Sequence, residues 1–250
     1  MKHVALVTCT TYPQLSESDE FLVDPLKKEG FISHAVPWDR KGVDWSLFDG
    51  IALRSCWNYP AKYKQFLTWL AALDSTIVWN PVNILRWNIQ KTYLFELEKK
   101  GISIIPTFRE LITKPVVGNS ARGVSKSPQT EGFLWQEFAP EVASEGEYSF
   151  VFIGGKLMHT VLKIPKKGDF RANVQFGATE KLINPSKALA QQAENVLDAV
   201  DANLLYARVD GINRNGTFLL MELELIEPHL FFDMNPKAAE TFAKVLKHYG

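Results

Sequence analysis

A β-hairpin near the C-terminus constrains the fold of this chain more than any other segment. Residues 206–226 read YARVDGINRNGTFLLMELELI, two strand-like runs separated by Asn215-Gly216, and Asn-Gly is a strong signal for a two-residue hairpin turn. Alternate residues of a strand share one face, so Glu222 and Glu224 should point the same way, about 7 Å apart, while the leucines between them face the other side. The chain should therefore contain an antiparallel sheet with one apolar and one acidic face.

Asp210 lies on the preceding strand of the same hairpin and adds a third carboxylate to Glu222 and Glu224. Carboxylates that converge repel one another unless a cation neutralises them, and their hard oxygen atoms suit Mg²⁺. The pattern therefore predicts a magnesium site. Alternation alone fits a solvated polar face of a half-exposed sheet equally well, and that alternative stays open.

Composition narrows the class of protein and of partner. The chain has 250 residues, with 28 Lys and Arg against 28 Asp and Glu and 46% hydrophobic residues, which fits one large or two small globular domains. The balanced charge and the lack of a basic run argue against nucleic-acid binding, and no uncharged stretch approaches the roughly 18 residues of a membrane helix. Cys9 and Cys56 are expected to be buried thiols, and no signal peptide is evident. We therefore expect a cytoplasmic protein with small-molecule partners.

The first eighty or so residues alternate between strand and helix patterns. Such alternation predicts a small α/β domain with a parallel sheet, in which ligands lie beyond the carboxyl ends of the strands. The expected strands cover residues 4–8, 31–38, 48–55 and 77–80, and the expected helices cover 18–29 and 61–73. Arg54 ends one of these strands, and it is a candidate for binding a substrate carboxylate, as is Arg208. A structural ion pair is an equal alternative for both.

Sheet patterns dominate the rest of the chain and predict an α+β region. A helix is expected at residues 88–100. Residues 114–124 should form a strand, a glycine-bearing loop and a second strand, and a buried strand is expected at 133–138. A hairpin at 149–165 should turn at Gly154-Gly155. Two further helices are expected at residues 185–201 and 236–248.

Two polar segments could bind phosphate. Lys114 precedes a loop with Gly118 and Gly123, which would let backbone amides approach a polyphosphate. The sequence GDFRAN places Arg171 and Asn173 after a basic stretch, and a guanidinium suits a phosphoryl group in transfer. Neither segment fits a standard phosphate-binding fingerprint, and ordinary turns or surface loops remain alternatives for both.

The order of the motifs is more specific than any one of them. The motifs are, in sequence, Lys91, Lys114 with its glycine loop, QEF, GEYS, GDFRAN, VDG and MELEL. The chain resembles the ATP-grasp ligases in the order of these motifs. Within that family, the chain is most similar to the glutathione-synthetase-like branch that includes the D-cycloserine-forming ligase. The motifs that carry this similarity are RSCWNY, WN-x-x-K-x-YL, IPT, YARVDG and MELELIEP. The resemblance implies an ATP-grasp fold preceded by a small parallel-sheet α/β domain (the pre-ATP-grasp domain), with α/β and α+β parts. The implied division is residues 1–86 for the pre-ATP-grasp domain, 87–136 for an abridged lid subdomain and 137–250 for the C-terminal subdomain with the magnesium-binding hairpin.

The resemblance also implies a role for each matching residue. Lys91 and Lys114 would bind the ATP phosphates beneath the loop at 118–123, and Lys114 and Arg171 would be catalytic. Adenine would lie against Gln136, Glu137 and Phe138. The remaining implied contacts are Glu147 with the ribose, Arg171 and Asn173 with the phosphates, and Asp210, Glu222 and Glu224 with one or two Mg²⁺ ions.

The activity implied by the resemblance is an ATP-dependent carboxylate-amine ligation on a small amino-acid-like substrate. An acyl phosphate would form and an amine would displace the phosphate, releasing ADP and phosphate. A homo-oligomer is compatible with the sequence. Two features depart from the family pattern: Glu224 stands where many relatives have Asn, and only 22 residues separate Lys91 from Lys114. The short lid leaves open a nucleotide-binding regulatory or sensor protein without efficient ligation, and a metal-free binding domain is a further alternative.

Overall fold

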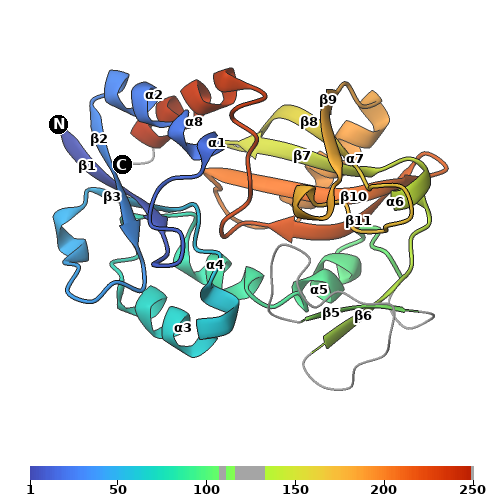
Figure 1. The fold of residues 1–250 in the computed structure, drawn as a ribbon, viewed down its shortest axis with the longest axis horizontal. Coiled ribbons are helices and arrows are strands. Elements are labelled where there is room, and N and C mark those ends of the chain that lie inside the picture. The colour runs from blue at the N-terminus through green and yellow to red at the C-terminus, as the bar shows by residue number, and fades with distance from the viewer. Residues whose placement is uncertain (107–110, 116–132, 249–250) are drawn as a thin grey trace.

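The computed structural model describes residues 1–106, 111–115 and 133–248. The first part of the chain forms a parallel sheet with the strand order β2-β1-β3-β4. Its strands are β1 (Lys2–Thr8), β2 (Phe31–Pro37), β3 (Gly50–Leu53) and β4 (Val78–Trp79). All four lie where the sequence predicts strands, so the prediction of an α/β first domain with a parallel sheet is confirmed (Figure 1).

The helix expected at residues 18–29 is instead two short helices, α1 (Glu17–Glu20) and α2 (Val23–Lys28). Pro25 lies in α2 and has no amide hydrogen to donate to the carbonyl one turn earlier, and its ring crowds that carbonyl, so this segment disfavours a single continuous helix. Gly30 follows α2 with a φ of 92°, as expected of a residue that ends a helix. The next elements are η1 (Trp45–Leu47), η2 (Tyr59–Lys62) and α3 (Tyr63–Ala72).

The second part forms a five-stranded antiparallel sheet with the order β11-β10-β7-β8-β9. Its strands are β7 (Glu147–Ile153), β8 (Lys156–Ile164), β9 (Thr179–Ile183), β10 (Tyr206–Arg214) and β11 (Thr217–Glu224). Both predicted hairpins are confirmed, and Asn215 and Gly216 have the positive φ values of 54° and 86° that their turn requires. The sequence analysis did not predict β9, because this edge strand reads TEKLI and has no fully buried side chain.

The two faces of the antiparallel sheet are covered differently. On one face, Phe150, Val209 and Leu223 belong to an apolar cluster with α5 (Tyr93–Lys99) and α7 (Lys187–Asp198). On the other face, α8 (Pro236–His248) packs over one end and joins a cluster that includes residues of β1 and α2. The sheet and the first domain therefore share a core, and the end of this face that α8 does not cover carries the polar side chains described below.

The helix expected at residues 88–100 begins later in the structure, at the start of α5 (Tyr93–Lys99). A separate helix that the sequence analysis did not predict, α4 (Val82–Asn88), precedes it. The Asn88 side chain forms hydrogen bonds with the backbone of β11. This tertiary contact holds the end of α4 against the sheet, and Lys91 lies in the segment between the two helices.

A two-stranded antiparallel sheet, β5 (Leu111–Pro115) with β6 (Phe133–Glu137), lies beside the larger sheet and is followed by α6 (Glu141–Ser144). The remaining short helix is η3 (Val174–Phe176). Two of the expected boundaries, after residues 86 and 136, fall within α4 and β6, and the division into three parts stays a prediction. Within the described ranges, no helix has the length and apolar character needed to cross a membrane.

Candidate active site

Charged side chains from all five strands of the antiparallel sheet gather at the uncovered end of one face. The register places Asp210 opposite Glu222 and Arg208 opposite Glu224. Across the rest of the sheet, Lys163 lies opposite Glu147 on one side and Glu180 on the other. Because paired residues share a face, the hairpin acids predicted from the sequence face a set of cations as well as one another.

Asp210 is the most enclosed of these carboxylates, with 2% of its surface exposed. Ser149 Oγ donates a hydrogen bond to Oδ1 at 2.7 Å, and Arg208 Nη2 donates one to Oδ2 at 2.8 Å. Burial by itself raises the pKa of Asp210, but the charges of Arg208 and Lys163 outweigh it and hold that pKa well below its usual range. Asp210 is therefore ionised near neutral pH.

Lys163 is a buried cation that the sequence analysis did not select. Its Nζ donates a hydrogen bond to Glu147 Oε1 at 2.6 Å and lies 3.4 Å from Asp210 Oδ2. Burial lowers the pKa of Lys163, yet the charges of Asp210 and Glu147 outweigh it and raise that pKa. A lone lysine within the apolar run HTVLKIP was the signal that could have identified it. The structure places Glu147, the predicted ribose ligand, in this pair.

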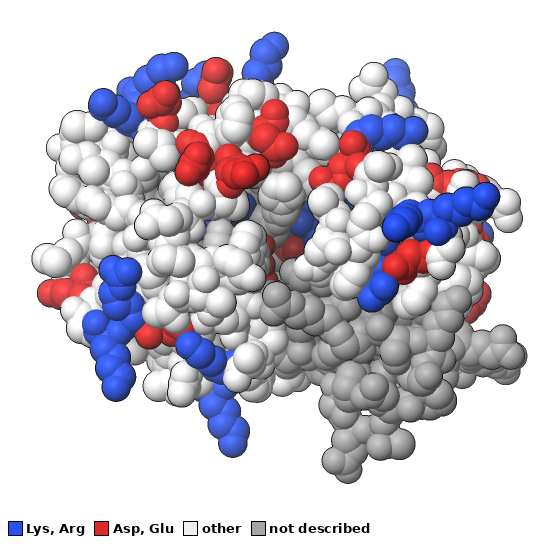
Figure 2. Space-filling view, in the orientation of Figure 1, with Lys and Arg blue, Asp and Glu red and all other residues white. Residues whose placement is uncertain are grey.

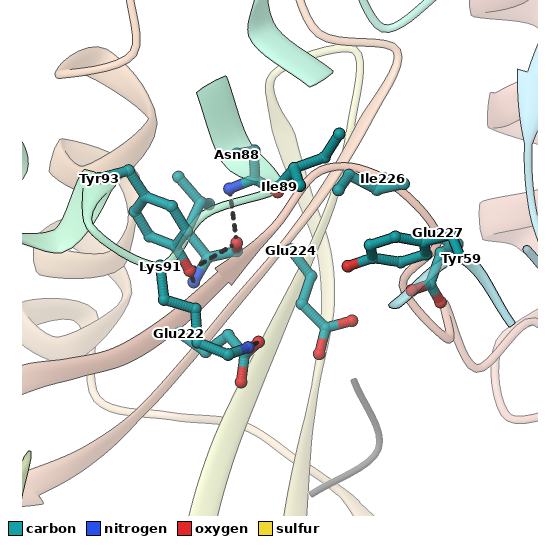
Figure 3. A pocket seen from close by; sticks show the side chains of 10 residues that line it. Tyr59, Asn88, Ile89, Lys91, Tyr93, Glu222, Glu224, Ile226 and Glu227 are labelled. Atoms are coloured by element: carbon teal, nitrogen blue, oxygen red, sulfur yellow. Dashed lines mark hydrogen bonds and ion pairs between the residues drawn. The ribbon is translucent and has the colours of Figure 1, made fainter. Parts of the chain in front are cut away.

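Glu222 and Glu224 each have a cationic partner. Lys91 Nζ forms an ion pair with Glu222 (Figure 3). Arg208 Nη2 donates a hydrogen bond to Glu224 Oε1 at 2.5 Å. Burial raises the pKa of Glu224 to about 7; the charge of Arg208 opposes this rise, and Glu222 and Asp210 add to it.

The three predicted magnesium ligands thus lie near one another but are engaged with cations. Among the described residues, no three carboxylate, imidazole or thiol groups are arranged to hold a metal ion. The donor set nevertheless fits a hard divalent cation, because its carboxylates lie on paired strand positions of one face. Lys91 and Arg208 would have to release Glu222 and Glu224 for these carboxylates to hold an ion, and the metal assignment remains a prediction.

Hydrogen bonds along its free edge fix β11 in place. Asn88 Nδ2 donates to the Leu223 carbonyl at 2.8 Å, and Asn88 Oδ1 accepts from Leu225 N at 2.9 Å. The Tyr93 hydroxyl also bonds to both backbone groups of Leu223. These contacts satisfy backbone groups that an edge strand leaves open. They position Glu222 and Glu224. The motif WN-x-x-K-x-YL did not by itself reveal this role of Asn88 and Tyr93.

A small pocket of about 20 Å³ lies between Lys91 and the end of β11 (Figure 3). Tyr59, Glu222, Glu224 and Glu227 line it together with Lys91, so the first domain contributes one polar side chain to it. Burial, with the nearby charges of Glu227, Glu222 and Glu224, raises the pKa of Tyr59 well above its usual value. The Tyr59 hydroxyl is therefore neutral and can donate a hydrogen bond.

A larger cleft of about 520 Å³ adjoins this pocket, and Glu224 and Glu227 line both. Tyr12, Ser16 to Ser18 and Trp57 form its wall on the first domain; on the sheet side it is lined by Lys163, 173–175, Glu180, Arg208, His229 and Phe231. Figure 2 shows a hollow between the two lobes, with acidic side chains over α1 at its edge. The volume is in the range of pockets that bind small molecules.

The two substrate candidates differ in their surroundings. Arg208 lines the cleft. Arg54 is 1% exposed, and its Nη2 contacts Asp19 Oδ1 and the Pro228 carbonyl, both at 2.8 Å. Arg54 therefore forms a buried ion pair that joins α1 to the segment after β11, which is the structural alternative considered for it.

The two phosphate-side candidates differ in their relation to the cleft. Asn173 lines it, whereas Arg171 is not among its lining residues. Arg171 Nη2 is 2.8 Å from Asp169 Oδ2, and its guanidinium lies 3.8 Å from the centre of the Phe176 ring. The side-chain hydrogen bond with Asp169 raises the pKa of Arg171. A phosphate contact by Arg171 stays a prediction.

The predicted adenine segment lies at the end of β6. Gln136 is 1% exposed, and the Glu137 amide donates to the Pro106 carbonyl at 2.7 Å. The ring of Phe138 makes an edge contact with that of Phe170. The backbone of Lys114 pairs with Leu134, while its side chain and the loop at 118–123 lie outside the described residues.

Comparison with known proteins gives a consistent family assignment. Residues 4–80 match the family "D-cycloserine synthetase DcsG, N-terminal domain", and residues 122–230 match "Prokaryotic glutathione synthetase, ATP-grasp domain". The cycloserine biosynthesis protein DcsG of Streptomyces lavendulae is 22% identical, over 97% of each chain.

Solved structures agree with the fold. The crystal structure of D-cycloserine synthetase DcsG is similar with a TM-score of 0.87, over 98% of this chain and 99% of that one, at 22% identity. A Chryseobacterium gregarium RiPP-associated ATP-grasp ligase, in complex with ADP and a leader and core peptide, has a TM-score of 0.70 at 10% identity and covers 100% and 98%. The ATP-grasp ligase PsnB, complexed with a precursor variant, Mg and ADP, has a TM-score of 0.65 at 14% identity, with 98% of each chain covered.

Proposed function

Since this chain belongs to the ATP-grasp ligases, we propose that it is an ATP-dependent carboxylate-amine ligase that acts on a small amino-acid-like substrate through an acyl phosphate. One observation carries the proposal: the charged end of the antiparallel sheet, with Lys163 and Arg208 set among carboxylates, opens into a 520 Å³ cleft. A cleft of this size accommodates a small molecule.

The reaction needs a way to activate a carboxylate, which is a poor electrophile because its leaving group would be oxide. Transfer of the γ-phosphoryl group of ATP to a carboxylate oxygen gives an acyl phosphate and ADP. An amine then attacks the carbonyl carbon, the C–O bond to phosphate breaks, and the amine loses a proton. The products are an amide, ADP and phosphate.

In this scheme the protein mainly positions the reactants and offsets their negative charge. We assign Lys91 and Lys114 to the ATP phosphates and the segment 136–138 to adenine, with Glu147 toward the ribose. Mg²⁺, when held by Asp210, Glu222 and Glu224, would neutralise phosphate oxygens. The assignment of Lys91 requires it to move from Glu222 to the nucleotide.

On the substrate side, Arg208 is the candidate for binding a carboxylate group, because it lines the cleft and its guanidinium is permanently charged. Lys163 supplies a second positive charge in the same cleft. We assign Arg171 and Asn173 to the phosphate side of the site, where Asn173 already lines the cleft. A cytoplasmic location is part of the same proposal.

The test is the release of ADP and phosphate from Mg·ATP in the presence of pairs drawn from a panel of amino acids and small amines. We expect at least one pair to stimulate release, and Glu222→Gln and Lys163→Met to reduce it by 100-fold or more. Lys187→Ala, on the exposed surface of α7, is the matched control and should have no effect. ATP binding without stimulated release from any pair would favour the regulatory or sensor alternative.

A further inference from the structure

Tyr59 is the polar side chain that the first domain contributes to the pocket beside Lys91. It begins η2, within the motif RSCWNYP that follows β3. The residue is 4% exposed, and its ring contacts that of Phe66 at a centroid distance of 4.9 Å. The ring is therefore anchored in the core of the first domain, which fixes the direction of its hydroxyl.

The hydroxyl of Tyr59 points into the pocket, on the side where Glu224 lies (Figure 3). No hydrogen bond between described residues involves it. Three other polar side chains that line this pocket are carboxylates: Glu222 and Glu224 of β11, and Glu227 just after it. A neutral donor held among acceptors, but bonded to none of them, is available to an oxygen atom that enters the pocket.

The pocket is narrow. Its volume of about 20 Å³ has room for one or two water-sized groups. Lys91 and the end of β11 bound it on the sheet side, so an oxygen that enters would lie between the proposed ATP-phosphate ligand and the proposed metal ligands. An oxygen of a phosphoryl group fits both the size of this pocket and its position between those ligands.

We propose that Tyr59 is a catalytic residue whose hydroxyl donates a hydrogen bond to an oxygen of the phosphoryl group during its transfer. This inference rests on the proposed function and adds a residue of the first domain to the site. The contact couples the two domains, because the donor lies on the loop after β3 and the acids lie on β11.

The experiment compares Tyr59→Phe with wild type in calorimetric titrations. The probes are Mg·ADP alone and Mg·ADP with aluminium fluoride, which mimics the phosphoryl group in transfer. We expect the variant to bind Mg·ADP as wild type does and the aluminium fluoride complex roughly 10- to 100-fold more weakly, as for a lost hydrogen bond to a charged group. Phenylalanine keeps the ring contact with Phe66, so the melting temperature should stay unchanged.

Tyr63→Phe is the matched control. Tyr63 begins α3, does not line the pocket, and its hydroxyl accepts a hydrogen bond from Gln90 at 2.9 Å. This variant should bind both probes like wild type.

Three outcomes would overturn the inference. Equal binding of the aluminium fluoride complex by Tyr59→Phe and wild type would show that the hydroxyl contributes nothing to transfer. Equal weakening of both probes would show that Tyr59 only positions ground-state ligands. If wild type bound neither probe, the proposed function would fail and the role of Tyr59 with it.

Discussion

Two buried arginine-aspartate pairs, one in each main part of the molecule, have the same chemistry but different surroundings. Arg54 and Asp19 have side chains 1% and 3% exposed, and Arg208 and Asp210 are 8% and 3% exposed. In the first pair, Asp19 also accepts a hydrogen bond from Ser55, and Arg54 donates one to the Pro228 carbonyl. The second pair adjoins Glu224 and Lys163, and Arg208 lines the cleft.

The difference shows that burial of an ion pair does not by itself distinguish structure from function. Both pairs are costly to desolvate and both are hydrogen-bonded. What separates them is access: a ligand in the cleft can reach Arg208, whereas Arg54 is enclosed by α1, β3 and the segment after β11. Substitution of Arg54 should therefore mainly lower stability, whereas substitution of Arg208 should mainly lower activity.

The largest effect is expected for Arg54→Met. The change leaves Asp19 buried without its cation, so the free energy of unfolding should fall by about 3–5 kcal/mol. Urea denaturation followed by circular dichroism measures this loss. Any folded fraction should bind Mg·ADP normally; a stable Arg54→Met protein with impaired nucleotide or substrate binding would reverse our assignment.

Arg208→Met should mainly affect activity. Stimulated phosphate release should fall by roughly 100- to 1000-fold, as when a charge-stabilising donor is removed from an active site. The free energy of unfolding should fall by only about 1–3 kcal/mol, because Ser149 and Lys163 still contact Asp210. If stability fell as far as in Arg54→Met while turnover per folded molecule stayed normal, the two pairs would be equivalent.

Asn88→Ala tests how the acidic strand is held in position. The change leaves the buried Leu225 amide, just after β11, without a partner and removes one of the two hydrogen bonds to the Leu223 carbonyl, which keeps the one from Tyr93. The free energy of unfolding should fall by about 1–3 kcal/mol. The change should also weaken the binding of Mg·ADP, because Glu222 and Glu224 lose a support. Asn195→Ala, on the exposed side of α7, is the control for the same measurements. Unchanged nucleotide binding in a destabilised Asn88→Ala protein would mean that β11 needs no edge support for its role.

The smallest effect concerns pH. The stability that comes from the depressed pKa of Asp210 is lost only below about pH 5, where the unfolded chain takes up a proton at this residue, so a loss between pH 7 and 5 should come from other groups. Burial lowers the pKa of His159 from 6.5 to about 4. In that window the unfolded chain takes up a proton at His159 that the folded protein does not, so this residue costs stability as the pH drops from about 6.5 to about 4. Burial lowers the pKa of His229 to about 4 as well and acts the same way, whereas the raised pKa of Glu224 acts in the opposite direction.

After allowance for partial exposure, the loss from His159 should be about 1–2 kcal/mol. Denaturation of wild type and His159→Gln at a series of pH values measures it. Between pH 6.5 and 4, the stability of the variant relative to wild type should rise by this amount. A variant with the wild-type slope would assign the pH dependence to another group.

Local patterns were enough to predict several elements. The Asn215-Gly216 turn, the alternation around Glu222 and Glu224, and the strand and helix alternation of the first domain all appear in the structure as expected. Each depends on the period of a strand or on the backbone freedom of a turn residue, which are properties of neighbouring residues. The family resemblance, confirmed over residues 4–80 and 122–230, depended on the order of the motifs.

Other features required contacts between distant segments. Lys163 is one charged residue in an apolar strand, and only the sheet register brings it to Asp210, 47 residues away. Nothing in the sequence distinguishes Asn88 and Tyr59 from other polar residues. Their roles appear only from the contact of Asn88 with β11 and from the place of Tyr59 in the pocket.

The sequence by itself determined most strands of the two larger sheets, the two hairpin turns and the face on which the hairpin acids lie, because side-chain alternation and turn chemistry act over a few residues. Only the tertiary structure decided which cation each acid meets, which arginine is enclosed and which reaches the cleft. Those outcomes depend on burial and on pairing between segments far apart in the chain, where electrostatic interactions are strengthened by the exclusion of water.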